Sequence, residues 1–237
     1  MPCAHYIVFH PDHARQSVKV NATTLVAGHL NTAWIGDVYV DAIGNGNEDP
    51  YVFHDPWLYS YCHASQLRRN IRPDSFLQKG SVMIFVSGQE ANNDRLTIDT
   101  FFVVGDIQKW NGQDSPELPA KFSDHHNNSG SALWQRHFKF PFEGSHIRVS
   151  HTYEAEQWVY GKELFSFLPL SANGGRTTIQ FDNIDVALRN KIKSKVKGKY
   201  PVLLEDADLK ILTALIETNT VTKVLKDIVF LSARPRL

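Results

Sequence analysis

Two apolar stretches decide the expected fold class: SVMIFVS at residues 81–87 and IDTFFVVGDI at residues 98–107. Both are rich in β-branched and aromatic residues, which favour strands. Each is close to a continuous apolar run, and a strand with that pattern usually lies inside a sheet with both of its faces covered. The sequence therefore predicts two central strands, with the rest of the sheet on either side of them in the chain.

Shorter segments with strand composition flank this pair. We expect five of them to form strands, over residues 5–9, 35–40, 136–140, 146–151 and 177–181. A helix is expected from Trp57 to Ile71. It is expected to end at Arg72, because the following Pro73 disfavours helical backbone in the residue before it. Residues 111–131 hold few aliphatic residues and many Gly, Ser, Pro, Asp and Asn, which predicts a long surface loop.

The last third of the chain has a helical pattern instead. In the first predicted helix apolar residues recur at every fourth position, at Ile184, Leu188, Ile192 and Val196. We expect Asp182 or Asn183 to cap this helix and Gly198 to end it. Two further helices are expected over residues 206–217 and 221–228, where apolar residues again fall on one face.

Strands followed by helices, rather than alternating with them, indicate an α+β fold. The sequence predicts a β-rich domain over residues 1–181 and a helical C-terminal extension over residues 182–237 that packs on it. A chain of 237 residues is long enough for one large domain of this kind with a sizeable core.

Composition and charge exclude several classes. The 25 Lys and Arg residues balance 25 Asp and Glu residues, so any contact with nucleic acid has to come from a local patch. The two cysteines, Cys3 and Cys62, form no CxxC pair, which disfavours a disulfide scaffold and a zinc knuckle. The chain shows no signal-peptide pattern and no apolar run that could span a bilayer, so we expect a cytoplasmic protein with no membrane partner.

Two groups of histidines beside aspartates could bind a metal ion. One is His10, Asp12 and His13, and the other is Asp124, His125 and His126. The second group resembles the metal motif of DHH phosphoesterases, although in those enzymes the motif follows an apolar strand and here it lies in a polar loop. The alternative is that these are solvated loop histidines. Helical metal-ligand spacing, a nucleophile elbow and a complete phosphate-binding loop are all missing from the sequence, so no cofactor is predicted.

A run of basic residues lies on the first predicted helix. Its six cations have no acid among them and are Arg189, Lys191, Lys193, Lys195, Lys197 and Lys199. Because the apolar stripe of this helix stays free to pack, we expect the cations on its outer face, where they suit contact with phosphates. The alternative is a solvated lysine face without a partner. A second basic patch, residues 67–72, contains Arg69 and Arg72.

Aromatic residues occur beside these features. Seven of them are candidates for stacking on a base, namely Trp57, Tyr59, Tyr61, Trp110, Tyr153, Trp158 and Tyr160. Core packing is the alternative interpretation, and it accounts for most aromatic residues in a chain of this composition.

The order of several short pieces is also informative. These are His54-Asp55-Pro56, the segment with Arg69 and Arg72, residues 79–86 and 97–107, Trp110, and residues 165–169. Together they resemble the nucleotide modification-associated domain families of bacteria and phages, which are similar to PUA-like, ASCH and EVE barrels. The resemblance covers about residues 50–170 and implies a PUA-like mixed β-barrel associated with modified nucleobases, with His54, Asp55, Arg69 and Arg72 as binding candidates. Where those families commonly have Gly-Asp, this chain has Gly80-Ser81.

The leading hypothesis is a protein that binds nucleic acid or a modified nucleobase, in a DNA or RNA modification or phage-defence system. Whether it is an enzyme stays open. The expected binding residues are His54, Asp55, Trp57, Arg69, Arg72, Trp110, Tyr153, Trp158, Lys191, Lys193, Lys195 and Lys197. One alternative is a metal-dependent hydrolase, a phosphoesterase or nuclease that uses the histidine and aspartate groups. Another is a protein-interaction module.

Overall fold

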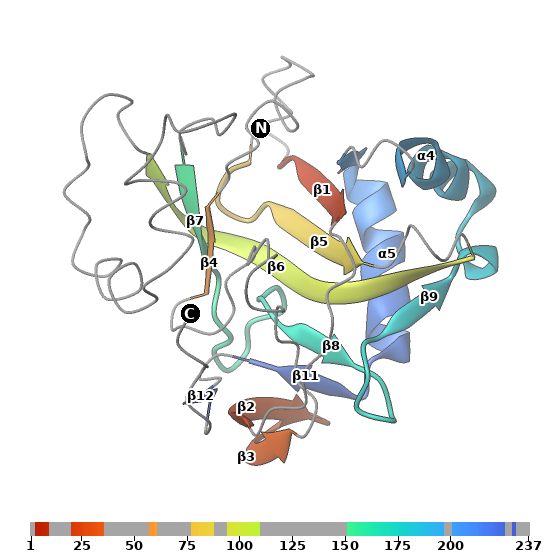
Figure 1. Ribbon diagram of the computed structural model, residues 1–237. Coiled ribbons are helices and arrows are strands. Elements are labelled where there is room, and N and C mark those ends of the chain that lie inside the picture. The colour runs from red at the N-terminus through yellow and green to blue at the C-terminus, as the bar shows by residue number, and fades with distance from the viewer. Residues whose placement is uncertain are drawn as a thin grey trace, which may run out of the picture.

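The computed structural model describes residues 3–9, 20–35, 57–60, 77–87, 94–109, 151–196, 201–225 and 229–230. These residues form mostly strands together with two α-helices, so the predicted α+β class is confirmed (Figure 1). Within these ranges, no helix has the length and hydropathy needed to cross a membrane.

The larger of two sheets is built around β5 (Val82–Ser87) and β6 (Arg95–Lys109). β5 lies between β6, which is antiparallel to it, and β1 (His5–Phe9), which is parallel. The order across this sheet is β10-β1-β5-β6-β7-β4, and β9 pairs with the first residues of β6. The outer strands are β4 (Leu58–Ser60), β7 (His151–Ala155), β9 (Thr178–Gln180) and β10 (Val202–Leu204). The prediction that the two apolar stretches form central strands is therefore confirmed.

β6 changes register twice along its length. Opposite β5, Phe85 pairs with Thr100 and Val86 pairs with Ile98, so Asp99 is an extra residue in the strand. Opposite β7, Gly105 is skipped in the same way. Such bulges bend and twist a strand. In this chain they allow one strand of 15 residues to meet β9 at its start and β7 at its end.

The smaller sheet has the order β12-β2-β11-β8, with β3 paired to β2. Its strands are β2 (Val20–Val26), β3 (His29–Ile35), β8 (Leu168–Leu170), β11 (Thr222–Val224) and β12 (Val229–Phe230). β2 and β3 form a hairpin whose two turn residues, Ala27 and Gly28, have φ values of 48° and 81°. Two positive φ values match the right-handed twist of hairpin strands. The two sheets meet where Phe101 and Phe167 exchange backbone hydrogen bonds of 2.9 Å.

Each face of β5 supports its own hydrophobic cluster. Val82, Ile84 and Val86 belong to one cluster, which also contains residues of the two helices. Met83 and Phe85 belong to the other, together with aromatic residues of β4 and β7. This alternation is the period of two that a strand imposes on its side chains. Burial on both faces also explains why β5 reads as a continuous apolar run rather than an alternating one.

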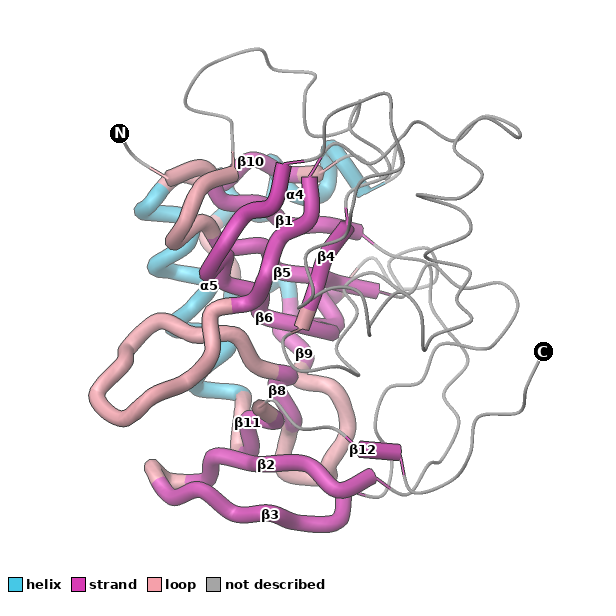
Figure 2. The backbone as a smooth tube through the Cα atoms, turned by 90° about the vertical axis from the view of Figure 1, so that its left-hand side faces the viewer, coloured by secondary structure: helices cyan, strands magenta, loops and turns pink. Residues whose placement is uncertain are grey.

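Two helices cover one face of the larger sheet, α4 (Val186–Val196) and α5 (Asp206–Asn219). Figure 2 shows both helices on the same side of the strands. Leu188 and Ile192 of α4 and Leu212 and Ile216 of α5 are buried in the cluster that contains Val82 and Ile84. Both helices and their inward faces were predicted from the spacing of apolar residues, and both are confirmed.

Several expectations about single elements are wrong. The segment that begins at Trp57 is expected to be helical, yet Leu58–Ser60 forms a strand that pairs with β7. A third helix is expected over residues 221–228, yet Thr222–Val224 forms a strand between β2 and β8. The cap of α4 is Asp185, which accepts hydrogen bonds from the N–H groups of Ala187 and Leu188 at 2.8 and 3.3 Å. Asp182 and Asn183 lie in the preceding 3-10 turn, η3 (Phe181–Asn183).

The described strands form two open sheets, and they close no barrel. The residues after position 181 supply strands as well as helices, since β10 pairs with β1 and β11 pairs with β2. The predicted domain boundary at that position stays a prediction. The predicted strand over residues 177–181 is confirmed as β9. The predicted loop over 111–131 and the predicted strand over 136–140 lie outside the described residues, as do the predicted strands over 35–40 and 146–151 apart from Ile35 and His151.

One buried histidine connects two strands of the larger sheet with the helix α5. His5 of β1 is 5% exposed, and its Nδ1 accepts a hydrogen bond of 3.0 Å from the Val82 N–H of β5. Its Nε2 lies 3.3 Å from Oδ1 of Asp206, the first residue of α5. Because Nδ1 is the acceptor, the neutral ring carries its proton on Nε2. Burial lowers the pKa of His5 below its usual 6.5, against an opposing effect of Asp206.

We therefore expect His5 to make the fold less stable in mild acid. The unfolded chain binds a proton on this ring near pH 6.5, before the folded chain does, so the contribution is fully present above that value and is lost as pH falls towards the lower folded pKa. Urea unfolding at a series of pH values would measure this effect. In His5→Asn an amide oxygen replaces Nδ1 as the acceptor and cannot titrate, so the variant should show a flatter dependence below pH 6.5. Identical pH profiles for the two proteins would contradict the assignment.

Candidate nucleic-acid interface

The basic helix α4 is docked by its apolar stripe, as the sequence predicts. Ile184, Leu188 and Ile192 are 3%, 2% and 0% exposed and pack into the core below the helix. Asp185 caps the helix and there is no acid in its first turn. The helix is thus held in one orientation. Its four described basic residues lie on its flanks rather than on the outer face, where they were expected, because the outer positions of the helix hold uncharged residues.

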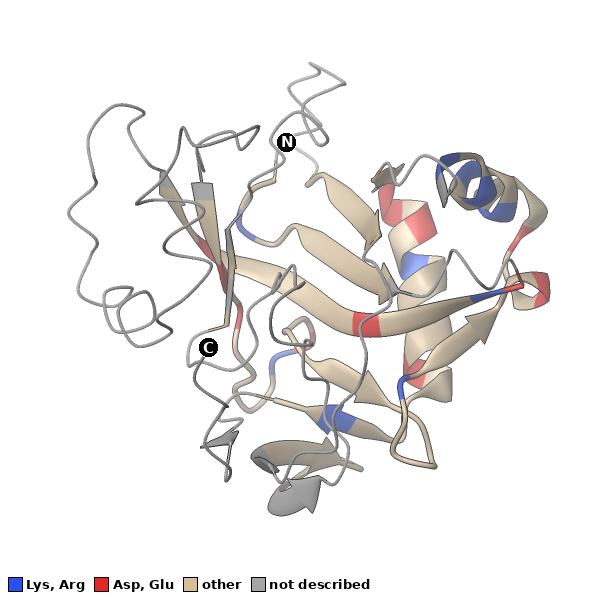
Figure 3. Cartoon of the chain, viewed as in Figure 1, with Lys and Arg blue, Asp and Glu red and all other residues tan. Residues whose placement is uncertain are grey.

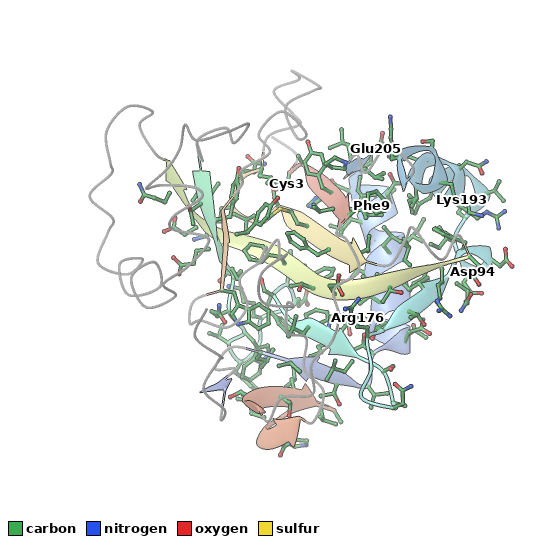
Figure 4. The ribbon with its side chains drawn as sticks, in the orientation of Figure 1. Cys3, Phe9, Asp94, Arg176, Lys193 and Glu205 are labelled. Atoms are coloured by element: carbon green, nitrogen blue, oxygen red, sulfur yellow. The ribbon has the colours of Figure 1, made fainter. Side chains whose placement is uncertain are left out.

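The described cations of α4 form two pairs, each four residues apart. Arg189 and Lys193 lie on one flank of the apolar stripe, and Lys191 and Lys195 lie on the other. The exposed residues between the flanks, Asn190 and Ser194 among them, carry no charge. Figure 3 shows the basic positions gathered on this helix, and Figure 4 labels Lys193 there.

Three of these four cations have partners. Arg189 pairs with the exposed carboxylate of Asp182 at 2.9 Å, and Lys193 lies 4.9 Å from the ring centre of Phe181. Lys191 pairs with Asp208 of α5 at 2.6 Å. Lys195 is exposed and makes no ion pair with any other residue of the described ranges. The pair of Arg189 with the exposed Asp182 is of the weak, solvent-screened kind, so a phosphate can compete for Arg189.

Some of the aromatic candidates are buried in the core. Trp57 is 0% exposed and Tyr153 is 7% exposed, and both belong to the core cluster on the β4 and β7 side of the sheet. Tyr153 stacks on Tyr59 with ring centres 6.2 Å apart. Trp158 is half-buried and packs against the other cluster. Core packing therefore explains Trp57 and Tyr153 in this structure.

Several expected site residues lie outside the described ranges. They are His54, Asp55, Arg69, Arg72, Trp110 and Lys197. The same holds for the two expected metal-binding groups, which are His10, Asp12, His13, Asp124, His125 and His126. Across the described residues there is no group of three or more His, Cys, Asp or Glu side chains that could hold a metal ion. The metal-site hypothesis stays a prediction.

Two features were not apparent from the sequence, namely the partner of one buried acid and the exposure of one aromatic candidate. Asp99, the extra residue of the β6 bulge, pairs with Arg176 at 2.9 Å, with side chains only 1% and 9% exposed. Tyr160 is 95% exposed at the tip of the connection between β7 and β8. The first depends on a contact between residues 77 positions apart (176 − 99), and the second on the direction of a turn, so neither has a local sequence signal.

Comparison with known proteins adds no family. No protein-family model matches the chain, and neither a curated protein nor a solved structure gives a match. The fold and the basic helix define this chain as an α+β protein with a cationic helix packed on its larger sheet.

Proposed function

We propose that this protein binds nucleic acid through the phosphate backbone, with α4 as the contacting element. The observation that carries the proposal is the arrangement of α4, whose apolar stripe is buried while two basic pairs border an uncharged outer face. Cations spaced along both sides of such a face suit the repeating phosphates of a nucleic-acid strand. Contacts of this kind fix position and supply affinity, but they carry no sequence information.

The resemblance to nucleotide modification-associated domains supports the same class of partner. It points to a PUA-like arrangement in which a modified base in DNA or RNA is the ligand. It also extends the proposal to a role in nucleic-acid modification or phage defence. The strand-rich sheets with helices on one side are compatible with that class.

The test is the salt dependence of binding. Each phosphate that the protein neutralises releases counterions, so log K falls with log salt at about −0.9 per contact on duplex and about −0.7 on single strands. Changing Lys191, Lys193, Lys195 and Lys197 together to Gln should flatten this slope by roughly two units, if they supply two or three contacts. Gln has a helix propensity similar to that of Lys, so α4 should survive. Fluorescence anisotropy with labelled oligonucleotides at several salt concentrations measures the slope.

A single substitution should raise the affinity for nucleic acid, where the quadruple lysine variant should lower it. Asp208→Asn removes the carboxylate that holds Lys191 but keeps an oxygen that can accept from the Glu205 N–H at 3.2 Å. This variant should bind more tightly than the wild type at low salt, because Lys191 no longer has to leave a partner. A wild-type protein that binds neither DNA nor RNA at low salt would overturn the proposal, as would an unchanged slope in the quadruple variant.

A further inference from the structure

The strand β3 is an edge strand of the smaller sheet. All seven of its residues pair with β2, and β2 pairs on its other side with β11 and β12. In the part of the chain that the structure describes, no strand pairs with the second side of β3. Both views place β3 at the bottom of the described part, beyond β2 (Figure 1, Figure 2). The N–H and C=O groups on such an edge are a template on which another strand can pair.

Two hydrogen bonds show which backbone groups of β3 point outward. The Thr23 carbonyl accepts from the Leu225 N–H at 2.8 Å, so the backbone groups of Thr23 face the β11 side and not β3. Thr23 opposes Thr32, and in an antiparallel pair of this kind both residues point their backbone groups away from each other. The Asn31 carbonyl instead lies towards β2, where the Thr24 hydroxyl donates to it at 3.0 Å. The N–H and C=O groups of Thr32 therefore point outward from the edge of the sheet.

The outward groups of β3 are spaced so that two copies of this strand satisfy each other. Because the direction of the backbone groups alternates along a strand, those of Leu30 and Trp34 point the same way as those of Thr32. In an antiparallel pair with a two-fold axis at Thr32, this residue opposes its own copy, and Leu30 opposes Trp34 of the second copy. Every outward N–H of the three residues then meets an outward carbonyl. Pairing of this kind is closed after two copies, which is the commonest form of oligomer.

The composition of the β2–β3 hairpin favours pairing between identical strands. Residues 20–35 contain no Lys, Arg, Asp, Glu or Pro. Natural proteins protect an exposed edge with charges or Pro, or by keeping the edge strand very short. The edge strands β8 and β10 have three residues each, whereas β3 has seven. On β3, Leu30 is also a large apolar residue that is 48% exposed. Two copies of this strand can approach without placing like charges opposite each other.

We infer that β3 pairs with β3 of a second copy of this chain, antiparallel about Thr32, and that the protein is a dimer with one sheet continuous across both copies. This inference goes beyond the proposed function and does not depend on nucleic-acid binding. A second copy is the occupant that the strand itself specifies, since its outward groups match their own copy and no like charges meet.

The first experiment measures the mass of the protein by analytical ultracentrifugation over a range of concentrations. The wild type should have twice the mass of the single chain at high concentration and should dissociate on dilution. Thr32→Pro should stay a single chain throughout, because Pro has no N–H to donate to the second strand. Its fold should survive, since the lost N–H points away from β2 and an edge strand accepts Pro at such a position. Thr32→Val keeps the N–H and a β-branched side chain, and it should dimerise like the wild type.

The second experiment tests the register and does not depend on Pro. Thr32→Lys and Thr32→Glu should each be a single chain, because the two-fold axis places like charges opposite each other, and an equal mixture of the two should associate again. Circular dichroism checks that each variant is folded. In the wild type, the amides of Leu30, Thr32 and Trp34 should exchange more slowly with solvent as the protein concentration rises. The Asn31 amide, which points towards β2, should not respond to concentration.

Each of the other outcomes overturns the inference. A wild type that remains a single chain at every concentration has no such interface, and slow exchange of the three amides in that single chain means that another part of the chain covers the edge. A dimer that survives in the folded Thr32→Pro variant is held by a different surface. A mass that keeps rising with concentration indicates an open chain of copies rather than a two-fold pair. Folded Lys and Glu variants that do not associate when mixed exclude the register about Thr32.

Discussion

Arg176→Met should lower the free energy of unfolding by about 3–5 kcal/mol, which is typical when one partner of a buried ion pair is removed. The Arg176 Nε lies 2.9 Å from Oδ1 of Asp99, and the two side chains are 9% and 1% exposed. Without the guanidinium, the Asp99 carboxylate stays in a site that water hardly reaches and loses this cation. Figure 4 labels Arg176, beside β6. Chemical denaturation monitored by circular dichroism measures the loss.

The chain offers a matched control for this variant. Arg189→Met removes the same type of side chain from an ion pair of the same length, 2.9 Å, but there Asp182 is 96% exposed. Exposed pairs contribute little, so the loss should be much smaller. Combining Arg176→Met with Asp99→Leu should recover part of the loss, since apolar pairs can replace buried ion pairs. Equal losses at the two arginines would contradict the structural role of Arg176.

Gly105→Ala should destabilise the fold by about 1–3 kcal/mol, because no space is left for a side chain at this position. A Cβ on Gly105 would lie 2.9 Å from both the Cα and the N of Glu156, and these are backbone atoms. The same Glu156 N–H donates to Val103 at 2.7 Å, so moving it away weakens this hydrogen bond. Gly105 is not one of the glycines with a positive φ, so its backbone conformation is open to other residues. Without the clash, Ala would therefore stabilise the chain by about 0.4–1 kcal/mol. A loss of stability in Gly105→Ala would therefore indicate the clash, and a gain would indicate that there is none.

Gly175→Ala is the corresponding control. Its Cβ would meet the side-chain oxygen of Asn173 at 3.0 Å, which can move because the turn is exposed. Thermal unfolding of both variants should show a clear fall in midpoint for Gly105→Ala and little change for Gly175→Ala. A Gly105→Ala protein as stable as the wild type would mean that β7 and β6 do not approach each other as described.

Most of the elements predicted correctly have a strong local pattern. β1, β5, β6, α4 and α5 each show a run or a spacing of apolar residues that only one type of element satisfies. The errors occur where pairing with a strand that is distant in the sequence determines the secondary structure. Residues 58–60 and 222–224 become strands because β7, β2 and β8 offer hydrogen-bonding edges to them. The β2–β3 hairpin has Ala-Gly in its turn instead of the common Asn-Gly or Asp-Gly, so its sequence signal is weak.

In the candidate site too, local features could be predicted from the sequence and contacts between distant residues could not. The lysine run is visible because its residues are close together in the sequence, and the apolar stripe of α4 indicates which side faces the core. The partner of Lys191 could not be predicted, because Asp208 belongs to another helix. Nor does composition distinguish the buried ring of Trp57 from the exposed ring of Tyr160, since burial depends on the sheet that packs around each of them.

The pairing of β1 with β10 has a consequence for synthesis on the ribosome. His5 opposes Leu204, so this edge of the larger sheet is incomplete until about 200 residues after β1 has left the exit tunnel. At roughly 5–20 residues per second this delay is about 10–40 s. During that time β1 and β5 are available to each other but not to β10 or α5, and the apolar face that α5 later covers is open to chaperones. Contacts between such distant segments also slow folding in general. Completion of this fold is thus expected to follow translation of the C-terminal strands rather than to accompany translation of the central ones.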